Sequence, residues 1–427
     1  MKHFFLTLIL AISLTQLSAQ LEKCGTMVNR SEKLNSGKEA QLRYFAAEQQ
    51  ATQWRQNQSG MKTQNTVTIP VVFHCVYKTT TGVTNIPDSV FQRQIDVMNE
   101  TYGLTNSNFS STRSIFDTLA TNTGIQFCLA AFDPQGNPSN GIVRYQNSQN
   151  WLSSITNDAI KTAYPPWDPS KYLNVWTCDM SLLGIPIVLG YATFPGEPAA
   201  TDGIVLQSEF VGFQNNGTSN NLGRTMVHEV GHYLGLRHIW GDGQQSSVPC
   251  DSTDYVDDTP HAADASQTDC DTTKNSCSTE NVFWSQLGID PPDMVENYMD
   301  YSTDGCMTMF TKGQSERMWS FLSTIRSDFL SNSVSCASIG INEHNPAFAD
   351  YVYVFPNPAS DRLQVNLTNA SADNLEVTVY NSLGQIAATY PLSSLQNTLD
   401  ISCLGSGIHF IKVHNPSNFC IKKIIKN

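Results

Sequence analysis

The sequence is poor in basic residues, in long apolar runs and in repeats. Lysine and arginine together number 25 against 38 aspartates and glutamates, and this net charge of −13 at pH 7 argues against nucleic acid as a partner. Beyond the first 14 residues no apolar run is long enough to cross a bilayer, so no transmembrane segment is expected in the mature protein. No internal repeat is present, and 427 residues suffice for a sizeable core and a second, small domain.

The N-terminus has the pattern of a secretory signal peptide. Lys2 precedes an apolar stretch, residues 4–14, and small residues follow up to Ala19. We expect cleavage after Ala19, which gives a signal peptide over residues 1–19 and a protein that is secreted or attached to the outer cell surface. An acidic balance is compatible with calcium sites in such a protein, although it is also typical of an ordinary solvated surface.

The run HEVGHYLGLRH, residues 228–238, has the spacing of a catalytic zinc site. His228 and His232 lie four residues apart, so a helix places both on one face, where they can bind one metal ion. Glu229 is positioned to take a proton from a metal-activated water. Gly235 ends the helix by adopting a left-handed turn, and the reversed chain brings back His238 as a third ligand. Three protein ligands leave one position open, as in catalytic zinc sites. The alternative is a polar helix with exposed histidines.

A second motif, NYMDY at residues 297–301, extends the pattern, and together the two motifs resemble the metzincin zinc peptidases. The resemblance implies that Met299 lies in a tight turn beneath the zinc and packs its thioether against the histidines. It also implies that the Tyr301 phenol binds the metal at rest and hydrogen-bonds the oxyanion in the transition state. The alternatives are a core methionine and a packed aromatic.

Within the metzincins, the chain resembles the compact bacterial and archaeal pappalysins of the ulilysin and mirolysin type. The resemblance covers roughly residues 20–337 and is carried by KCGTM at 23–27, IPVVFHCVY at 69–77, the zinc motif, CDSTDYVDDTP at 250–260 and NYMDYSTDGCM at 297–307. It implies an α+β metzincin catalytic domain with a twisted mixed sheet, an active-site helix and a loop-rich C-terminal subdomain.

Cys24, just after the predicted signal peptide, is the best candidate for a zinc-binding thiol. Eleven cysteines leave at least one outside any intramolecular disulfide, and a thiolate is a good zinc ligand. The resemblance implies that Cys24 closes the zinc site in a latent precursor. The alternative is a disulfide to Cys336.

Other cysteines are expected to form disulfides in an exported protein. The resemblance implies the pairs Cys250–Cys277 and Cys270–Cys306 in the loops after the active-site helix. A bridge between Cys403 and Cys420 is a further expectation near the C-terminus. The pairing of three cysteines in strand-like runs remains open: Cys75, Cys128 and Cys178.

Two further sites follow from the resemblance. Related pappalysins bind structural calcium in the acidic loop, and the corresponding positions are Asp254, Val256 and Thr259. No EF-hand spacing is present, and a solvated acidic loop is the alternative. Several compact pappalysins cleave before arginine or lysine with an acidic pocket floor after the methionine turn. Asp304 is the candidate here, although Gly305 stands where another acid is expected.

Periodicity predicts the order of the elements. Helices are expected at 40–58, 90–102, 224–235 and 313–330, strands at 67–77, 124–132, 172–180 and 203–211, and an edge strand at 188–196. An exposed edge strand can bind an extended peptide by pairing with it.

Residues after Cys336 form a separate region. Residues 338–350 read as a linker, and 351–427 as short alternating strands of a small all-β, sandwich-like domain. The Pro356-Asn357-Pro358 segment, the Asn381–Gly384 turn, the 407–413 strand and the terminal lysines resemble the type IX C-terminal sorting domain of Bacteroidetes. The strand departs from that family at His409, where an aromatic is common. The alternative is a carbohydrate- or surface-binding β-sandwich.

The sequence therefore predicts a secreted zinc endopeptidase made as a latent zymogen, acting on proteins or peptides and exported by the type IX machinery. Its pro-segment is expected at 20–61 and its catalytic domain at 62–337. Activation requires a cut between Cys24 and Val67, and the bonds before Arg55 and Lys62 are the candidates because that stretch lacks apolar periodicity. The alternative functions are a catalytically silent adhesin on the same scaffold and a metzincin of another family.

Overall fold

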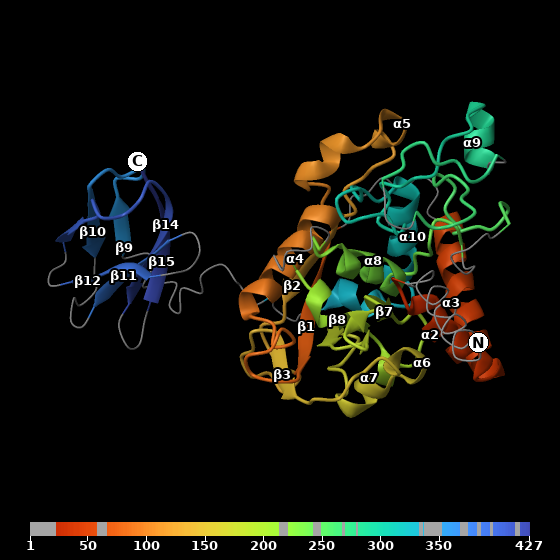
Figure 1. The fold of residues 1–427 in the computed structure, drawn as a ribbon, viewed down its shortest axis with the longest axis horizontal. Coiled ribbons are helices and arrows are strands. Elements are labelled where there is room, and N and C mark those ends of the chain that lie inside the picture. The colour runs from red at the N-terminus through yellow and green to blue at the C-terminus, as the bar shows by residue number, and fades with distance from the viewer. Residues whose placement is uncertain are drawn as a thin grey trace, which may run out of the picture. The chain divides into compact units, whose positions relative to one another are not determined.

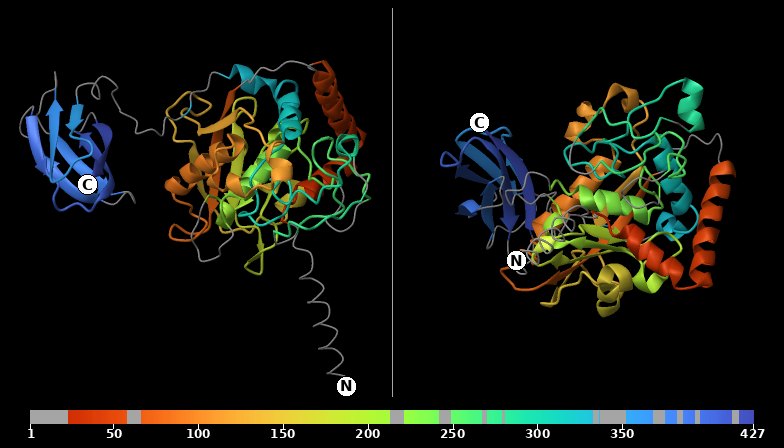
Figure 2. Two further views of the ribbon diagram at one scale, coloured as in Figure 1. Left: turned by 90° about the horizontal axis from the view of Figure 1, so that it is seen from above. Right: turned by 45° about the vertical axis from the view of Figure 1, so that its right-hand side comes forward.

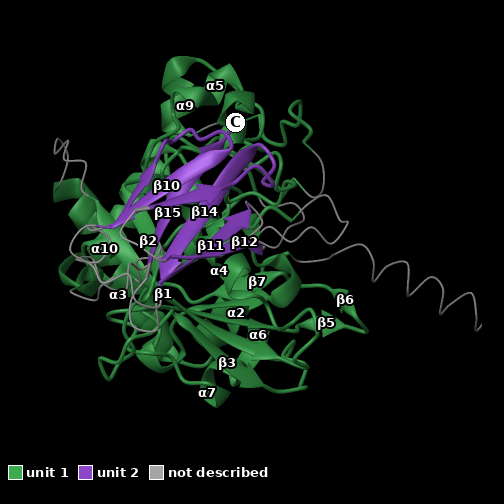
Figure 3. Cartoon of the chain, turned by 90° about the vertical axis from the view of Figure 1, so that its left-hand side faces the viewer, with its two compact units in different colours: residues 1–337 green, residues 338–427 purple. Residues whose placement is uncertain are grey.

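The computed structural model describes most of the chain: residues 23–57, 66–212, 221–241, 249–266, 270–278, 281–332, 336, 352–367, 375–381, 386–392, 396–414 and 419–427. The predicted signal peptide, Lys62, Gly384 and the predicted linker lie outside these residues. The chain divides into two compact units, residues 1–337 and 338–427 (Figure 3).

The first unit is built on a twisted six-stranded sheet of order β2-β1-β4-β8-β7, with β3 also paired to β1. All of these pairs are parallel except β7 with β8, so β7 is an antiparallel edge strand. The central strands are buried on both faces, which explains their continuous apolar sequences. The bounds are β1 Val67–Tyr77, β2 Ile125–Leu129, β3 Ile142–Gln146, β4 Leu173–Cys178, β7 Gly190–Ala192 and β8 Ile204–Gln207.

Two helices cover the face of the sheet that carries the site: α4 (Asp88–Tyr102) and α8 (Arg224–Tyr233), which lies beside the edge strand β7 (Figure 1). Their inward residues join the strands in one apolar core. Three further helices, at residues 26–35, 38–57 and 312–322, are described below. The other described elements of this unit are short: α5 Ser114–Asp117, α6 Ser154–Asn157, α7 Ala159–Ala163, α9 Val282–Leu287, β5 Ser181–Leu182, β6 Ile185–Pro186 and the 3-10 turns η1 Ser107–Ser111, η2 Ala199–Thr201, η3 Ser208–Phe210 and η4 Ser327–Ser331.

The helix expected at 313–330 is shorter than its periodicity suggests. α10 spans Lys312–Leu322 and begins with a capping box at Thr311. The chain then turns, and Arg326 forms a buried two-point ion pair with Asp202, at 2.7 and 3.0 Å, while its Nε donates to the Tyr233 carbonyl. This pairing requires Arg326 to point back toward α8, so the helix cannot continue through it.

The N-terminal segment forms two helices, α2 (Thr26–Asn35) and α3 (Lys38–Asn57). α3 packs against α10 along the outside of the unit (Figures 1 and 2). The sequence predicted a helix at 40–58 but gave no indication of α2. Arg55, one of the two expected cleavage positions, lies within α3 and donates to the Tyr255 carbonyl at 3.0 Å. A helical bond of this kind is a poor site for activation cleavage.

Disulfides join Cys250 to Cys277 and Cys270 to Cys306, the two pairs that the resemblance implied. A third bridge joins Cys128 in β2 to Cys336, so the alternative Cys24–Cys336 pairing is wrong and Cys24 is a buried thiol. Cys75 and Cys178 are buried in the strands β1 and β4 and are not in disulfides.

The second unit consists of two antiparallel sheets, with orders β13-β10-β9 and β12-β11-β14-β15. Apolar residues from both sheets form one core, as in a sandwich. The expected Cys403–Cys420 bridge is wrong: Cys420 is buried in this core, whereas Cys403 is exposed beyond β13. The strands are β9 Val352–Phe355, β10 Arg362–Leu367, β11 Glu376–Asn381, β12 Ile386–Pro391, β13 Gln396–Asp400, β14 Gly407–His414 and β15 Phe419–Lys426.

Candidate active site

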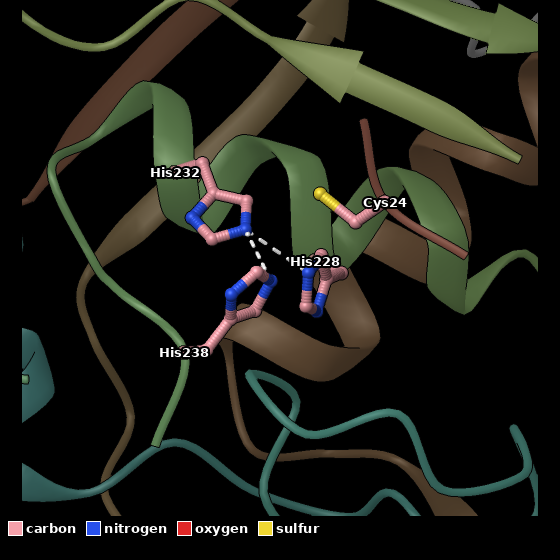
Figure 4. A group of neighbouring side chains, drawn as sticks. All are labelled: Cys24, His228, His232 and His238. Atoms are coloured by element: carbon pink, nitrogen blue, oxygen red, sulfur yellow. Dashed lines mark hydrogen bonds between the residues drawn. The ribbon is translucent and has the colours of Figure 1, made fainter. Parts of the chain in front are cut away.

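Three histidine side chains converge at α8. His228 and His232 lie one turn apart on the helix, and Gly235, with φ of +91°, turns the chain so that His238 returns to them. The Nε2 atom of His232 lies 3.0 Å from that of His228 and 3.1 Å from that of His238 (Figure 4). A side chain at position 235 would collide with the Phe321 ring, so glycine is needed here for both conformation and space.

Backbone carbonyls fix the orientation of two of these rings. The Nδ1 atom of His228 lies 2.8 Å from the Tyr298 carbonyl, and that of His232 lies 2.8 Å from the Leu236 carbonyl. Nδ1–H donation to the carbonyls directs the Nε2 lone pairs toward a common point. Burial lowers the pKa of His228 to about 4, which keeps the ring neutral, the form that binds metal. Tetrahedral zinc with ordinary bond lengths separates nitrogen ligands by about 3.3 Å, so the three imidazoles fit such an ion.

Cys24, in the N-terminal segment before α2, completes this group. Its Sγ atom and one nitrogen of each histidine all lie within 4.8 Å of one another, and all four residues are buried (Figure 4). The segment pairs in parallel with the edge strand: the Gly25 amide donates to the Gly190 carbonyl at 2.8 Å, and the Leu189 amide donates to the Lys23 carbonyl at 2.9 Å. The expected edge strand above the cleft is β7, and in this structure residues 23–25 pair along it.

The same N-terminal segment also contacts Glu229, a contact that the sequence analysis missed. The Thr26 hydroxyl donates to a Glu229 carboxylate oxygen at 2.7 Å and accepts from the Ala192 amide at 2.8 Å. Burial raises the pKa of the Glu229 carboxyl to about 7, and the hydrogen bonds from Thr26 and Cys24 oppose that shift. The available signal was a hydroxyl residue two positions after Cys24 in KCGTM.

Met299 and Tyr301 lie beneath and beside the histidines. A β-carbon added to Gly231 would come within 2.4 Å of the Met299 sulfur, so the thioether packs directly against α8. The Tyr301 ring centroid lies 5.6 Å from that of His228 and 5.0 Å from that of His238. Its hydroxyl donates to the Cys24 carbonyl at 3.4 Å, so the phenol reaches the segment that covers the histidines.

The Asp304 side chain lies beside the N-terminus of α8. Its carboxylate accepts hydrogen bonds from the backbone amides of Leu222, at 2.7 Å, and Arg224, at 3.2 Å. The Lys23 side chain reaches the same region, and its ammonium donates to the Tyr301 carbonyl. Burial lowers the pKa of Lys23, while the charges of Asp304 and Asp300 oppose that shift. The sequence analysis overlooked Lys23, although it is a basic residue directly before Cys24.

The predicted calcium residues lie together in a buried loop. Asp254 accepts from the Val256 amide at 3.0 Å and from the Thr259 hydroxyl at 2.9 Å, and that hydroxyl also lies 2.9 Å from the Val256 carbonyl. Burial raises the pKa of Asp254 to about 7. The neighbouring Asp258 is used elsewhere, because its carboxylate binds Thr311 and Gly313 at the start of α10.

Comparison with known proteins gives two family matches. Residues 154–323 match the family of pregnancy-associated plasma protein-A, and residues 353–427 match the secretion system C-terminal sorting domain. An extracellular metalloprotease of Pyricularia oryzae is 33% identical over 270 residues, 62% of this chain and 77% of that protein. One of Arthroderma otae is 31% identical over 257 residues, 59% and 76% of the two chains.

Two solved structures from Tannerella forsythia are similar. A promirolysin mutant superposes with a TM-score of 0.60 at 33% identity and covers 72% of this chain and 97% of that one. Mature mirolysin in complex with a cleaved peptide gives a TM-score of 0.54 at 37% identity, covering 62% and 96%.

The fold and the histidine site define a zinc metalloprotease of the metzincin class. The chain belongs to the pappalysin family. Its C-terminal unit is a type IX sorting domain, so the protein is secreted or attached to the cell surface, and its substrates are proteins or peptides. Within the described part of the chain, no helix combines the length and apolar character needed to span a bilayer.

Proposed function

We propose that the protein is a secreted zinc endopeptidase, made as a latent precursor, in which His228, His232 and His238 hold the metal and Cys24 occupies its fourth position before activation. The observation that carries the proposal is the convergence of three buried imidazole nitrogens on one point beside a buried carboxylate. Glu229 is buried and forms no ion pair among the described residues. Such burial of a carboxyl group is energetically costly, which favours a chemical role for the residue.

The chain's own residues supply the proton transfers and the substrate contacts. A zinc ion held by the histidines would acidify a water molecule and polarise the scissile carbonyl. Glu229 then takes the water proton and delivers it to the leaving amine, so one carboxylate serves as base and acid. The Tyr301 hydroxyl, released from the Cys24 carbonyl, donates to the developing oxyanion. The edge strand β7 pairs with the extended substrate once the pro-segment leaves.

Removal of the metal tests the catalytic assignment. Processed protein should clear casein or gelatin, lose that activity with phenanthroline and regain it when zinc is added back. The control is the same assay with a non-chelating phenanthroline isomer. Activity that persists at full chelation would contradict a metal-dependent mechanism, and absence of cleavage under every condition would favour a silent binding protein.

We further propose that the substrate pocket prefers arginine or lysine after the scissile bond, with Asp304 at its floor. The support is the position of Lys23, a half-buried basic residue: burial lowers its pKa, and the nearby charges of Asp304 and Asp300 oppose that shift. Peptide-library profiling of the processed enzyme should show basic enrichment at that position, and Asp304→Asn should reduce it about tenfold or more. Ser302→Ala is a useful control nearby. Enrichment of apolar residues in the unsubstituted enzyme would contradict the preference.

We also propose that calcium stabilises the loop Asp254–Thr259. The oxygens of Asp254, Val256 and Thr259 lie close together and are of the type that calcium binds. Binding would favour ionised Asp254, whose pKa burial raises in the absence of a cation. Residues 20–61 are the proposed pro-segment, and the bond before Lys62 is the remaining candidate for the activation cut.

A further inference from the structure

The Glu48 side chain, on α3, forms ion pairs with two arginines of the first unit, Arg237 and Arg317. The part of the first unit that follows α3 is called the catalytic unit. The Nη2 atom of Arg317 lies 2.8 and 3.1 Å from the two Glu48 carboxylate oxygens, and that of Arg237 lies 3.2 Å from one of them. The side chains are only 0%, 6% and 16% exposed for Arg317, Arg237 and Glu48, respectively. The contact is therefore an enclosed ion pair rather than a surface one.

The two arginines belong to a rigid part of the catalytic unit. Arg317 lies on α10 and its Nε donates to the Gly235 carbonyl at 2.8 Å, at the turn that ends α8. Arg237 directly precedes His238, and its guanidinium stacks on the Tyr255 ring at 4.1 Å. Both guanidinium groups are thus oriented by the unit itself toward the position that Glu48 fills.

The rest of α3 fits this position. Ala47 and Ala51, on either side of Glu48 along the helix, pack against Phe321 of α10. The Tyr44 hydroxyl lies 3.2 Å from the Glu48 carboxylate and also accepts from Arg237. Small apolar residues bring the helix close to α10, and Glu48 supplies the charge that the arginine pair requires.

We propose that Arg237 and Arg317 form a carboxylate-binding site on the catalytic unit, separate from the metal site, whose ligand in the precursor is Glu48 of the pro-segment. The assignment of residues 20–61 as a pro-segment rests on the proposed function. The arginine site gives the pro-segment a second point of attachment, so that cutting the chain after α3 does not by itself release the helix from the core.

Hydrogen–deuterium exchange on the full chain tests the site without relying on activity. All variants carry Glu229→Gln, so that no chain processes itself. In this background Glu48→Gln should speed amide exchange across residues 38–57 about ten- to a hundredfold, since it replaces the ion-paired contacts with Arg317 and Arg237 by weaker ones to a neutral amide. Glu39→Gln is the matched control, because Glu39 lies on the same helix in an exposed pair with Arg43 and should change exchange less than twofold.

Glu48→Asp provides a second test of the geometry. It keeps the charge but shortens the side chain by one methylene, so exchange should fall between that of the parent and of Glu48→Gln. Exchange in Glu48→Gln within twofold of the Glu39→Gln control would overturn the proposal. Because the readout is exchange, loosening of α3 in a protein that never cleaves peptides would uphold the carboxylate site and contradict only the proposed function.

Discussion

Glu229→Gln should retain zinc and lose nearly all peptidase activity. The amide fills the same buried space but cannot accept the water proton or pass it to the leaving amine. We therefore expect kcat/KM to fall about a hundredfold to ten-thousandfold. Metal content should stay at that of the parent, because backbone carbonyls and not the Glu229 carboxylate orient the His228 and His232 rings. Peptide hydrolysis and zinc content of the processed protein measure the two effects.

Glu100→Gln serves as the control for this substitution. Glu100 lies on α4 in a partly exposed pair with Arg93, so its loss should leave both zinc content and turnover near those of the parent. Substantial hydrolysis by Glu229→Gln with full zinc content would remove Glu229 from the proposed mechanism.

Cys24→Ala should convert the silent precursor into one that is prematurely active or rapidly degraded. The substitution removes the only thiol among the four residues of the cluster and leaves the three histidines with an open position. Activity should still be below that of processed enzyme, because the Thr26 hydroxyl still donates a hydrogen bond to the Glu229 carboxylate. Peptide hydrolysis by the freshly purified, uncut chain, followed in time on a gel, measures both outcomes.

Cys403→Ala is the matched control, since Cys403 is exposed in the second unit and belongs to no disulfide. It should leave the precursor silent and intact. A Cys24→Ala precursor as stable and as inactive as the parent would mean that latency comes from blockage of the cleft by the segment Lys23–Thr26 alone.

The zinc motif was readable from sequence because its geometry is local. His228 and His232 need only helical spacing, and Gly235 signals a turn with positive φ that places His238. The β-strands were likewise predictable, since their continuous apolar runs are buried on both faces.

The contacts of the pro-segment were not predictable in the same way. Thr26 binding to Glu229, Lys23 facing Asp304 and Glu48 entering its arginine pair join residues more than 180 positions apart. No periodicity encodes such pairs, and each residue alone reads as an ordinary polar side chain. The same limit explains the wrong Cys403–Cys420 pairing: Cys403 lies in an exposed turn after β13, whereas Cys420 points from β15 into the core.

The Cys128–Cys336 disulfide has a mechanical consequence. Cys336 is the last described residue before the sorting domain, and its partner lies in β2, which pairs with β1 inside the main sheet. Tension applied to the chain from residue 338 onward therefore reaches the main sheet through the Cys128–Cys336 disulfide. Because η4 and α10 lie between residues 128 and 336, they are inside the covalent loop that this disulfide closes. Force transmitted along the chain from the second unit therefore bypasses α10, the helix whose Arg317 holds the turn at Gly235.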